Sequence, residues 1–163
     1  MKHLILITFL LTSMMSFSQP DWNVIIKKSA LMFVGGFADG TAETLRVHYN
    51  EFKEVHPNAN DSYWNPSKSW YNKYADGLQP YQNKWYHLGI KPAYKERFPY
   101  STTVFAWTTD GYHLLRTGRN MLLITAIVIP INHKKSFKNY AIEAVSYSIV
   151  YGAGFTLAWD VIY

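Results

Sequence analysis

The sequence contains no cysteine. Small exported domains usually depend on disulfides for stability, and a lipid anchor behind a signal segment is attached through a cysteine. Both are excluded here. If the chain is exported, its stability must come from packing, from a membrane or from a partner.

The common catalytic signatures are missing as well. The chain has no Gly-x-Ser-x-Gly elbow, no phosphate-binding glycine loop and no His-Glu-x-x-His. Hydroxyl side chains at 101–109 precede Asp110 and His113, but all of them fall on one predicted helix. A serine triad normally draws its members from separate elements, so we do not expect one.

A strong excess of one charge is also lacking. Sixteen Lys and Arg residues stand against 11 Asp and Glu, which gives a formal net charge of +5, and the basic residues are scattered. Nucleic acid is therefore not an expected partner. Anionic lipid headgroups or acidic glycans would tolerate this balance.

Aromatic side chains, by contrast, are abundant. They make up 17% of the 163 residues, with 13 tyrosines and six tryptophans. Such side chains combine an apolar body with a polar tip and collect at membrane interfaces and binding surfaces. The composition therefore favours one of these two environments.

Residues 1–18 have the pattern of a secretory signal peptide. Lys2 is followed by an apolar stretch, and small residues precede Gln19. An uncleaved membrane anchor is the alternative, although the apolar stretch is shorter than the roughly 20 residues of a span. The remaining residues, 19–163, are expected to form a single helical domain.

The apolar periodicity predicts an all-α fold. We expect a small bundle of three long helices, with a short helix in an aromatic- and Pro-rich connecting block. Pro57 and Pro130 end the first two long helices, and Ser101 and Ser136 are expected to cap the second and third. The long helices are placed at 22–55, 101–129 and 136–163.

The connecting block spans residues 57–100. Asn65 as a cap and Pro66 at the first helical position predict a short helix that ends at Gly77. The aromatic rings of the block form either a contact surface for lipid or sugar, or a packed cover over the helix ends. The candidates for surface contact are Trp64, Trp70, Tyr74, Trp85 and Tyr86.

Several features favour membrane association over the alternative of a freely soluble periplasmic or secreted bundle. The last helix approaches the length and polarity of a membrane span. Small residues at Gly36 and Gly40, and again at Gly152 and Gly154, suit close contacts between helices.

Charged residues recur within the predicted helices, and we call this set the polar seam. Asp110 and His113 are three residues apart, and Asp39 and Glu43 are four apart, so each pair lies on one helix face. The arginines near these acids, including Arg119, would make the seam a network of ion pairs. The seam consists of Asp39, Glu43, Arg46, Asp110, His113, Arg116 and Glu143.

The alternative is that the seam holds a divalent metal. Carboxylates from facing helices together with a histidine at i+3 are the ingredients of a metal site in a helical bundle. Its ligands would be Asp39, Glu43, Asp110, His113 and Glu143.

Two functions follow from these patterns. The first is an exported, membrane-associated envelope protein with a structural or interaction role, whose partner is membrane lipid or an envelope protein assembly. The second is a small membrane-bound, metal-dependent hydrolase that acts on lipid or glycan. The sequence leaves open whether the protein is an enzyme.

Overall fold

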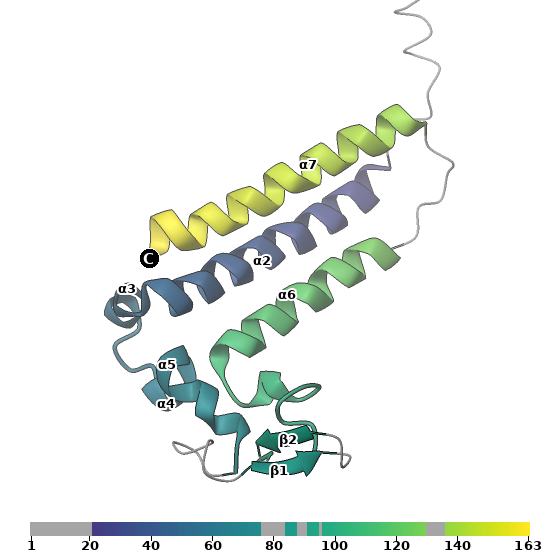
Figure 1. The fold of residues 1–163 in the computed structure, drawn as a ribbon. Helices are drawn as coiled ribbons and strands as arrows, with labels where there is room; N and C mark the ends of the chain where they lie inside the picture. Colours follow the sequence, from purple (N-terminus) through teal and green to yellow (C-terminus); the bar gives the residue numbers. More distant parts are fainter. Residues whose placement is uncertain (1–20, 76–83, 88–90, 95, 130–135) are drawn as a thin grey trace, which may run out of the picture.

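The computed structural model describes residues 21–75, 84–87, 91–94, 96–129 and 136–163. The predicted signal peptide at 1–18 lies outside the described residues. The described chain is largely helical, as the all-α prediction requires, and one short antiparallel hairpin is added to it (Figure 1).

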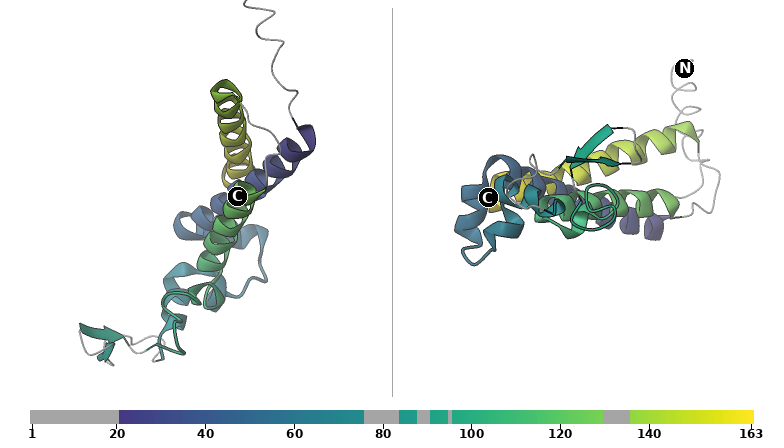
Figure 2. Two further views of the ribbon diagram at one scale, coloured as in Figure 1. Left: turned by 90° about the vertical axis from the view of Figure 1, so that its right-hand side faces the viewer. Right: turned by 60° about the horizontal axis from the view of Figure 1, so that its bottom comes forward.

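Three long helices organise the molecule: α2 (Trp22–Val47), α6 (Gly111–Val128) and α7 (Phe137–Thr156). Helix α7 continues as a stretch of π-helix, η3 (Leu157–Ile162). Helix α2 lies in the middle, with α6 and α7 along its two sides (Figures 1 and 2). The arrangement is an open layer of helices, so α6 and α7 each keep one long side uncovered.

Glycines bring α2 and α7 into close contact. A Cβ atom added at Gly36 would lie 2.0 Å from the carbonyl oxygen of Tyr151, and one at Gly154 would lie 2.2 Å from that of Phe33. At Gly40 the nearest atom would be the Phe155 oxygen, at 2.6 Å. The two backbones therefore touch at positions where one of the two helices has a glycine.

The predicted first helix, 22–55, is in fact two helices. Helix α2 ends at Val47, and α3 (Tyr49–Val55) follows after His48, whose φ of −128° and ψ of 46° are not helical. No glycine or proline marks this break. The His48 ring packs edge-on against Trp159 of η3, with ring centroids 4.9 Å apart, so the break accompanies a tertiary contact that the local sequence does not announce.

The connecting block is built from short pieces: α4 (Asp61–Trp64), α5 (Pro66–Ser69), the 3₁₀ turn η1 (Trp70–Lys73) and the paired strands β1 (Lys84–His87) and β2 (Lys91–Tyr94). Asn65 caps α5 as predicted, since its side chain accepts a hydrogen bond from the Ser67 N–H. The expected end at Gly77 lies outside the described residues. The predicted helix is shorter than expected, because Tyr74 already adopts an extended conformation and bridges to Glu96.

The second long helix begins later than predicted. It starts at Gly111, and the segment from Ser101 consists of turns and the 3₁₀ turn η2 (Ala106–Thr108). Ser101 is not a cap, because its hydroxyl donates to the Lys73 carbonyl oxygen at 2.6 Å. The hydroxyls of Thr108 and Thr109 donate to backbone oxygens three residues back, and such local bonds compete with helix formation.

The third long helix begins where it was expected. The Ser136 side chain accepts from the Asn139 N–H at the start of α7. The helix and η3 together span Phe137–Ile162, the described segment that is long and apolar enough to cross a membrane by length and composition.

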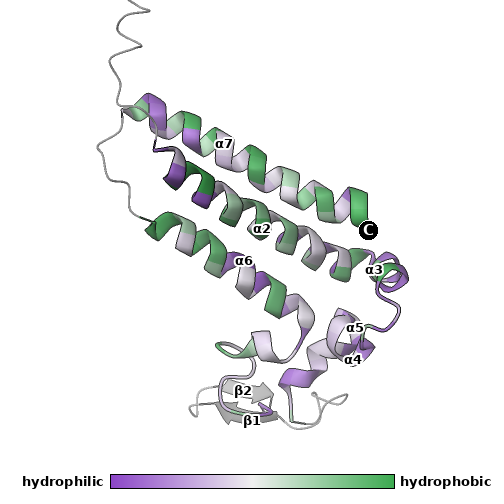
Figure 3. Cartoon of the chain, turned by 180° about the vertical axis from the view of Figure 1, so that it is seen from behind, coloured by the Kyte–Doolittle hydropathy of each residue, from purple (hydrophilic) through white to green (hydrophobic). Residues whose placement is uncertain are grey.

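Large apolar side chains lie mostly on the outside. Among the described residues, the buried apolar set has six members, and four of them are alanines. The exposed fraction is 88% for Phe137, 76% for Ile127 and 66% for Ile149. Figure 3 shows hydrophobic positions along the outer helices and hydrophilic ones on α4 and α5.

Candidate functional site: the inter-helix charge network

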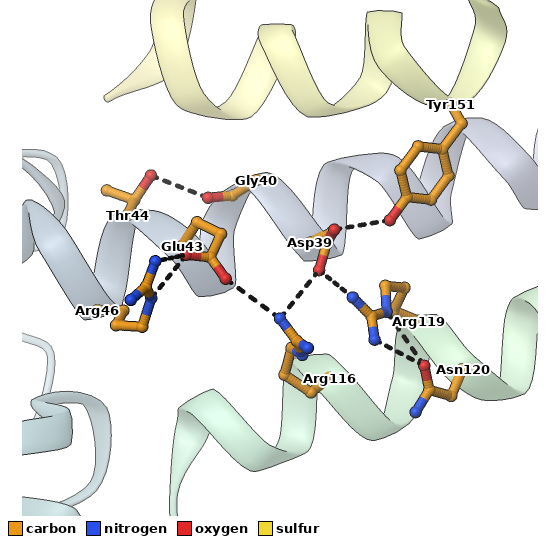
Figure 4. A network of polar contacts seen from close by, with 9 residues as sticks. All are labelled: Asp39, Gly40, Glu43, Thr44, Arg46, Arg116, Arg119, Asn120 and Tyr151. Carbon is orange, nitrogen blue, oxygen red and sulfur yellow. Dashed lines mark hydrogen bonds and ion pairs between the residues drawn. The ribbon is translucent and has the colours of Figure 1, made fainter. Parts of the chain in front are cut away.

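The acids of α2 meet the arginines of α6. Arg119 forms an ion pair with Asp39, and Arg116 Nη1 lies 3.1 Å from a Glu43 oxygen and 3.6 Å from Asp39 (Figure 4). Two carboxylates therefore face two guanidinium groups across the contact between α2 and α6. Since the side chains of Asp39, Glu43 and Arg119 are each less than a fifth exposed, water screens these pairs poorly.

The third helix joins the network through a hydroxyl. Tyr151 of α7 donates to the second Asp39 oxygen at 2.7 Å. Both oxygens of Asp39 are thus occupied, one by α6 and the other by α7. This carboxylate links the three long helices at one point of the layer (Figure 4).

Arg46 belongs to the edge of the network. Its guanidinium lies 2.6 Å from Glu43 on the same helix, but its side chain is 59% exposed. An exposed pair of this kind stabilises a protein by about 0–1 kcal/mol. The charge balance that matters is therefore the one between Asp39 and Glu43 on one side and Arg116 and Arg119 on the other.

Asp110 and His113 are not part of this network. Asp110 is the N-cap of α6, and one of its oxygens accepts from the His113 N–H at 2.8 Å. The His113 Nδ1 lies 2.8 Å from each Asp110 oxygen. The interpretation that both residues project from within one helix was wrong for Asp110, which has extended backbone angles and precedes the first helical residue.

The buried Asp110 ties α6 to the connecting block. Its pair with His113 lies near Tyr63 and Lys73, whose pKa values shift mainly through burial: the Tyr63 pKa rises, and the Lys73 pKa falls although the Asp110 charge opposes that fall. Asn72 donates to the Thr109 carbonyl oxygen at 3.0 Å. This bond, one residue before the cap, joins the block to the start of α6.

Glu143 lies apart from both groups. It is on α7, where Tyr147 donates to it at 3.4 Å within the same helix. The five residues proposed as metal ligands are thus divided among three places. In the described part of the chain, no group of three or more His, Cys, Asp or Glu side chains is arranged to hold a metal ion, so the predicted ligand set is not assembled.

The sequence analysis missed a second polar cluster, centred on Asp61 of α4. Asp61 accepts hydrogen bonds from Lys68 and Tyr49, both at 2.9 Å, and lies 2.8 Å from Lys53. Hydrogen bonds from Lys53, Lys68 and Tyr49 hold the Asp61 pKa well below its usual range, whereas burial and this carboxylate raise the Tyr49 pKa to about 12. The contributing residues are up to 19 positions apart in the sequence, and no spacing rule connects them.

Three of the five aromatic candidates for surface contact are engaged with other rings. Trp64, Trp70 and Tyr74 are half-buried. Trp64 packs on Phe52 with centroids 5.7 Å apart, and Trp70 packs edge-on against Tyr74 at the same separation. Trp85 and Tyr86 are on β1, and their side chains lie outside the described part of the structure.

Comparisons with known proteins give no relative. No protein-family model, no curated protein and no solved structure matches the chain.

Proposed function

We propose that the protein is an exported structural or interaction component of the cell envelope, with α2, α6 and α7 embedded as a helical layer in a membrane. The observation that carries this proposal is the distribution of polarity. The acids Asp39 and Glu43 face two arginines at the contact of α2 with α6, while large apolar side chains face outward. A membrane solvent favours this arrangement, because only buried and paired charges are tolerated there.

The dimensions of the layer support the proposal. The 18 residues of α6 span about 27 Å at a rise of about 1.5 Å per residue, close to the roughly 30 Å of a hydrocarbon core. Helix α2 and the α7–η3 segment each have 26 residues, enough to cross with a tilt.

The helix contacts support it too. In lipid, apolar side chains gain little by leaving the solvent, so helices associate through small residues and interhelical polar bonds. The contact between α2 and α7 uses both: Gly36, Gly40 and Gly154 permit backbone contact, and Tyr151 bonds to Asp39.

The ends of the layer also suit headgroup regions. The exposed lysines Lys27, near the start of α2, and Lys138, at the start of α7, lie at one end (Figure 1). The polar and aromatic connecting block lies at the other. Cations and aromatic rings at the two ends match the anionic surface and the interface of a bilayer.

A structural or interaction role is favoured over the metal-dependent hydrolase. The hydrolase needs the five proposed ligands in one place, whereas the structure divides them. In the charge network the arginines fill the space that a metal would need.

Fractionation of cells that express the full chain tests the membrane proposal. We expect the protein to stay in the membrane fraction after washes with high salt and with strong alkali, and to leave it only in detergent. Release by high salt would indicate a peripheral protein held by charge, and recovery in the soluble fraction would contradict the proposal.

A further inference from the structure

A cavity of about 530 Å³ lies where α3 and the loop that follows it meet the connecting block. Its walls come from several elements: Thr41 of α2, Phe52 and Val55 of α3, Trp64 of α4, Leu115 of α6 and Tyr163 after η3. Ligand pockets have volumes of about 300–1,000 Å³. The cavity is therefore large enough to hold a small molecule.

The walls are fixed by packing before any ligand arrives. The Phe52 ring lies 5.7 Å from Trp64 and 5.6 Å from Tyr163, measured between centroids. Trp64 is held against the start of α6, since a Cβ atom added at Gly111 would lie 2.3 Å from its ring. A pre-formed pocket lowers the ordering cost of binding.

The polar groups of the cavity gather on its exposed side. The loop at 56–59 forms this side, and Asn58 and His56 belong to it. The His56 Nε2 lies 3.2 Å from the Tyr163 hydroxyl, so one hydrogen-bonding pair sits at the edge of an otherwise largely apolar lining. A ligand with an apolar body and a single polar end would satisfy both parts.

We infer that this cavity binds the acyl chain of a membrane amphiphile, with the polar end of the ligand at His56 and Asn58. The inference rests on the proposed function, because an embedded layer places this end of the helices next to lipid headgroups, where such amphiphiles are abundant. The chain would lie against Phe52, Val55 and Leu115.

Photo-crosslinking of the full-length protein in detergent tests the inference. Two probes carry the same diazirine-labelled chain: a free fatty acid and a phosphatidylethanolamine. We expect saturable labelling of peptides from residues 52–64 by at least one probe, and the probe that labels identifies the source of the chain. Labelling that does not saturate, or that spreads evenly over all apolar segments, would overturn the inference.

A matched pair of variants distinguishes binding in the cavity from nonspecific labelling of exposed apolar surface. Val55 and Val47 are exposed to similar extents, 45% and 53%, but only Val55 lines the cavity. Val55→Trp should weaken saturable labelling by about tenfold, as expected when the indole displaces about two methylene groups of the ligand. Val47→Trp should leave it unchanged. Equal labelling of the two variants would contradict the inference.

Ala59→Leu, which narrows the cavity from the loop side, provides a second filled variant if Val55→Trp does not fold. The membrane proposal has a separate readout when the phospholipid probe is used on the protein in vesicles instead of detergent, namely non-saturable labelling of Phe137–Ile162. That labelling can persist when cavity labelling fails, and it can fail when cavity labelling persists. The two claims can therefore be rejected independently.

Discussion

Asp110 shows how a single side chain can satisfy both a backbone and a side-chain partner. It is 1% exposed, caps α6 and pairs with His113, so both its oxygens have partners inside the protein. From the sequence, the Asp-x-x-His spacing was equally compatible with a metal ligand pair. The structure distinguishes them through the backbone of Asp110, which lies outside the helix.

Replacing Asp110 tests this capping role. Asp110→Ala should lower the free energy of unfolding by about 1–3 kcal/mol, because the cap is lost and buried donors are left unpaired. Asp110→Asn keeps an acceptor for the His113 N–H and should lower the free energy of unfolding by clearly less. Thermal unfolding in detergent measures both. Equal losses for the two variants would argue for a role of the negative charge itself.

Asp61 makes a pH-dependent contribution. Because its pKa is lowered in the folded protein by Lys53, Lys68 and Tyr49, its stabilisation is complete above the unfolded pKa of about 3.9 and is lost as pH falls towards the folded pKa. We expect stability to decline below about pH 4, and the decline to be shallower in Asp61→Asn. Glu54→Gln, at an exposed acid of α3, is the control and should follow the wild type.

At the scale of elements, side chains at the helix contacts determine how the layer assembles. Gly36 and Gly154 lie at the contact of α2 with α7, whereas an added Cβ at Gly152 or Gly118 would meet nothing within 4 Å. The sequence pairs Gly152 with Gly154, so spacing alone could not tell which glycine faces the neighbouring helix.

Alanine substitutions test this difference. Gly36→Ala and Gly154→Ala should destabilise the protein by about 1–3 kcal/mol, because backbone atoms of the opposite helix must move. Gly152→Ala should be neutral or should stabilise by up to about 1 kcal/mol through better helix propensity. Unfolding in detergent compares the three variants. A large loss of stability in Gly152→Ala alone would contradict the assignment of Gly36 and Gly154 to the contact between α2 and α7.

The charge network makes a second prediction about the elements. Arg119→Leu and Asp39→Leu should each destabilise the protein by about 3–5 kcal/mol, since each leaves a poorly solvated partner behind. The double variant should cost less than the sum of the two, with a coupling of about 0.5–3 kcal/mol. Arg46→Leu, at the exposed edge, should cost less than about 1 kcal/mol. Additive effects of Arg119→Leu and Asp39→Leu would contradict the network.

Element boundaries show what the sequence can and cannot predict. The caps at Asn65 and Ser136 were predicted from local chemistry, and both side chains accept the expected backbone hydrogen bonds. The break at His48 and the late start of α6 were missed. The break accompanies the contact of His48 with Trp159, and the late start accompanies local hydrogen bonds of threonines. The apolar periodicity of the sequence carries no information on either.

The candidate site follows the same pattern. The sequence brought Asp39, Glu43 and the arginines of 116–119 into one predicted seam, and the structure places them together. The sequence could not indicate that Asp110 and Glu143 lie elsewhere, because which residues face each other across two helices depends on the rotation and offset of each helix. Tyr151 was missed because a lone tyrosine in an apolar helix carries no spacing signal.

For the whole molecule, the central claim is that the outer faces of α6 and α7 are covered by lipid. The described chain buries few large apolar side chains and exposes many. A water-soluble monomer rarely leaves large apolar surfaces uncovered. If lipid covers these faces, residues on them should be inaccessible to reagents dissolved in water.

Cysteine accessibility tests the claim most directly, because the native chain has no cysteine to interfere. Single variants Ile127→Cys and Ile149→Cys probe the two outer faces, and Glu54→Cys probes the exposed surface of α3. In isolated, opened membranes, a membrane-impermeant maleimide should label Glu54→Cys rapidly and the other two only after the membrane is dissolved in denaturing detergent. Rapid labelling of all three variants in the opened membranes, before detergent is added, would contradict the account.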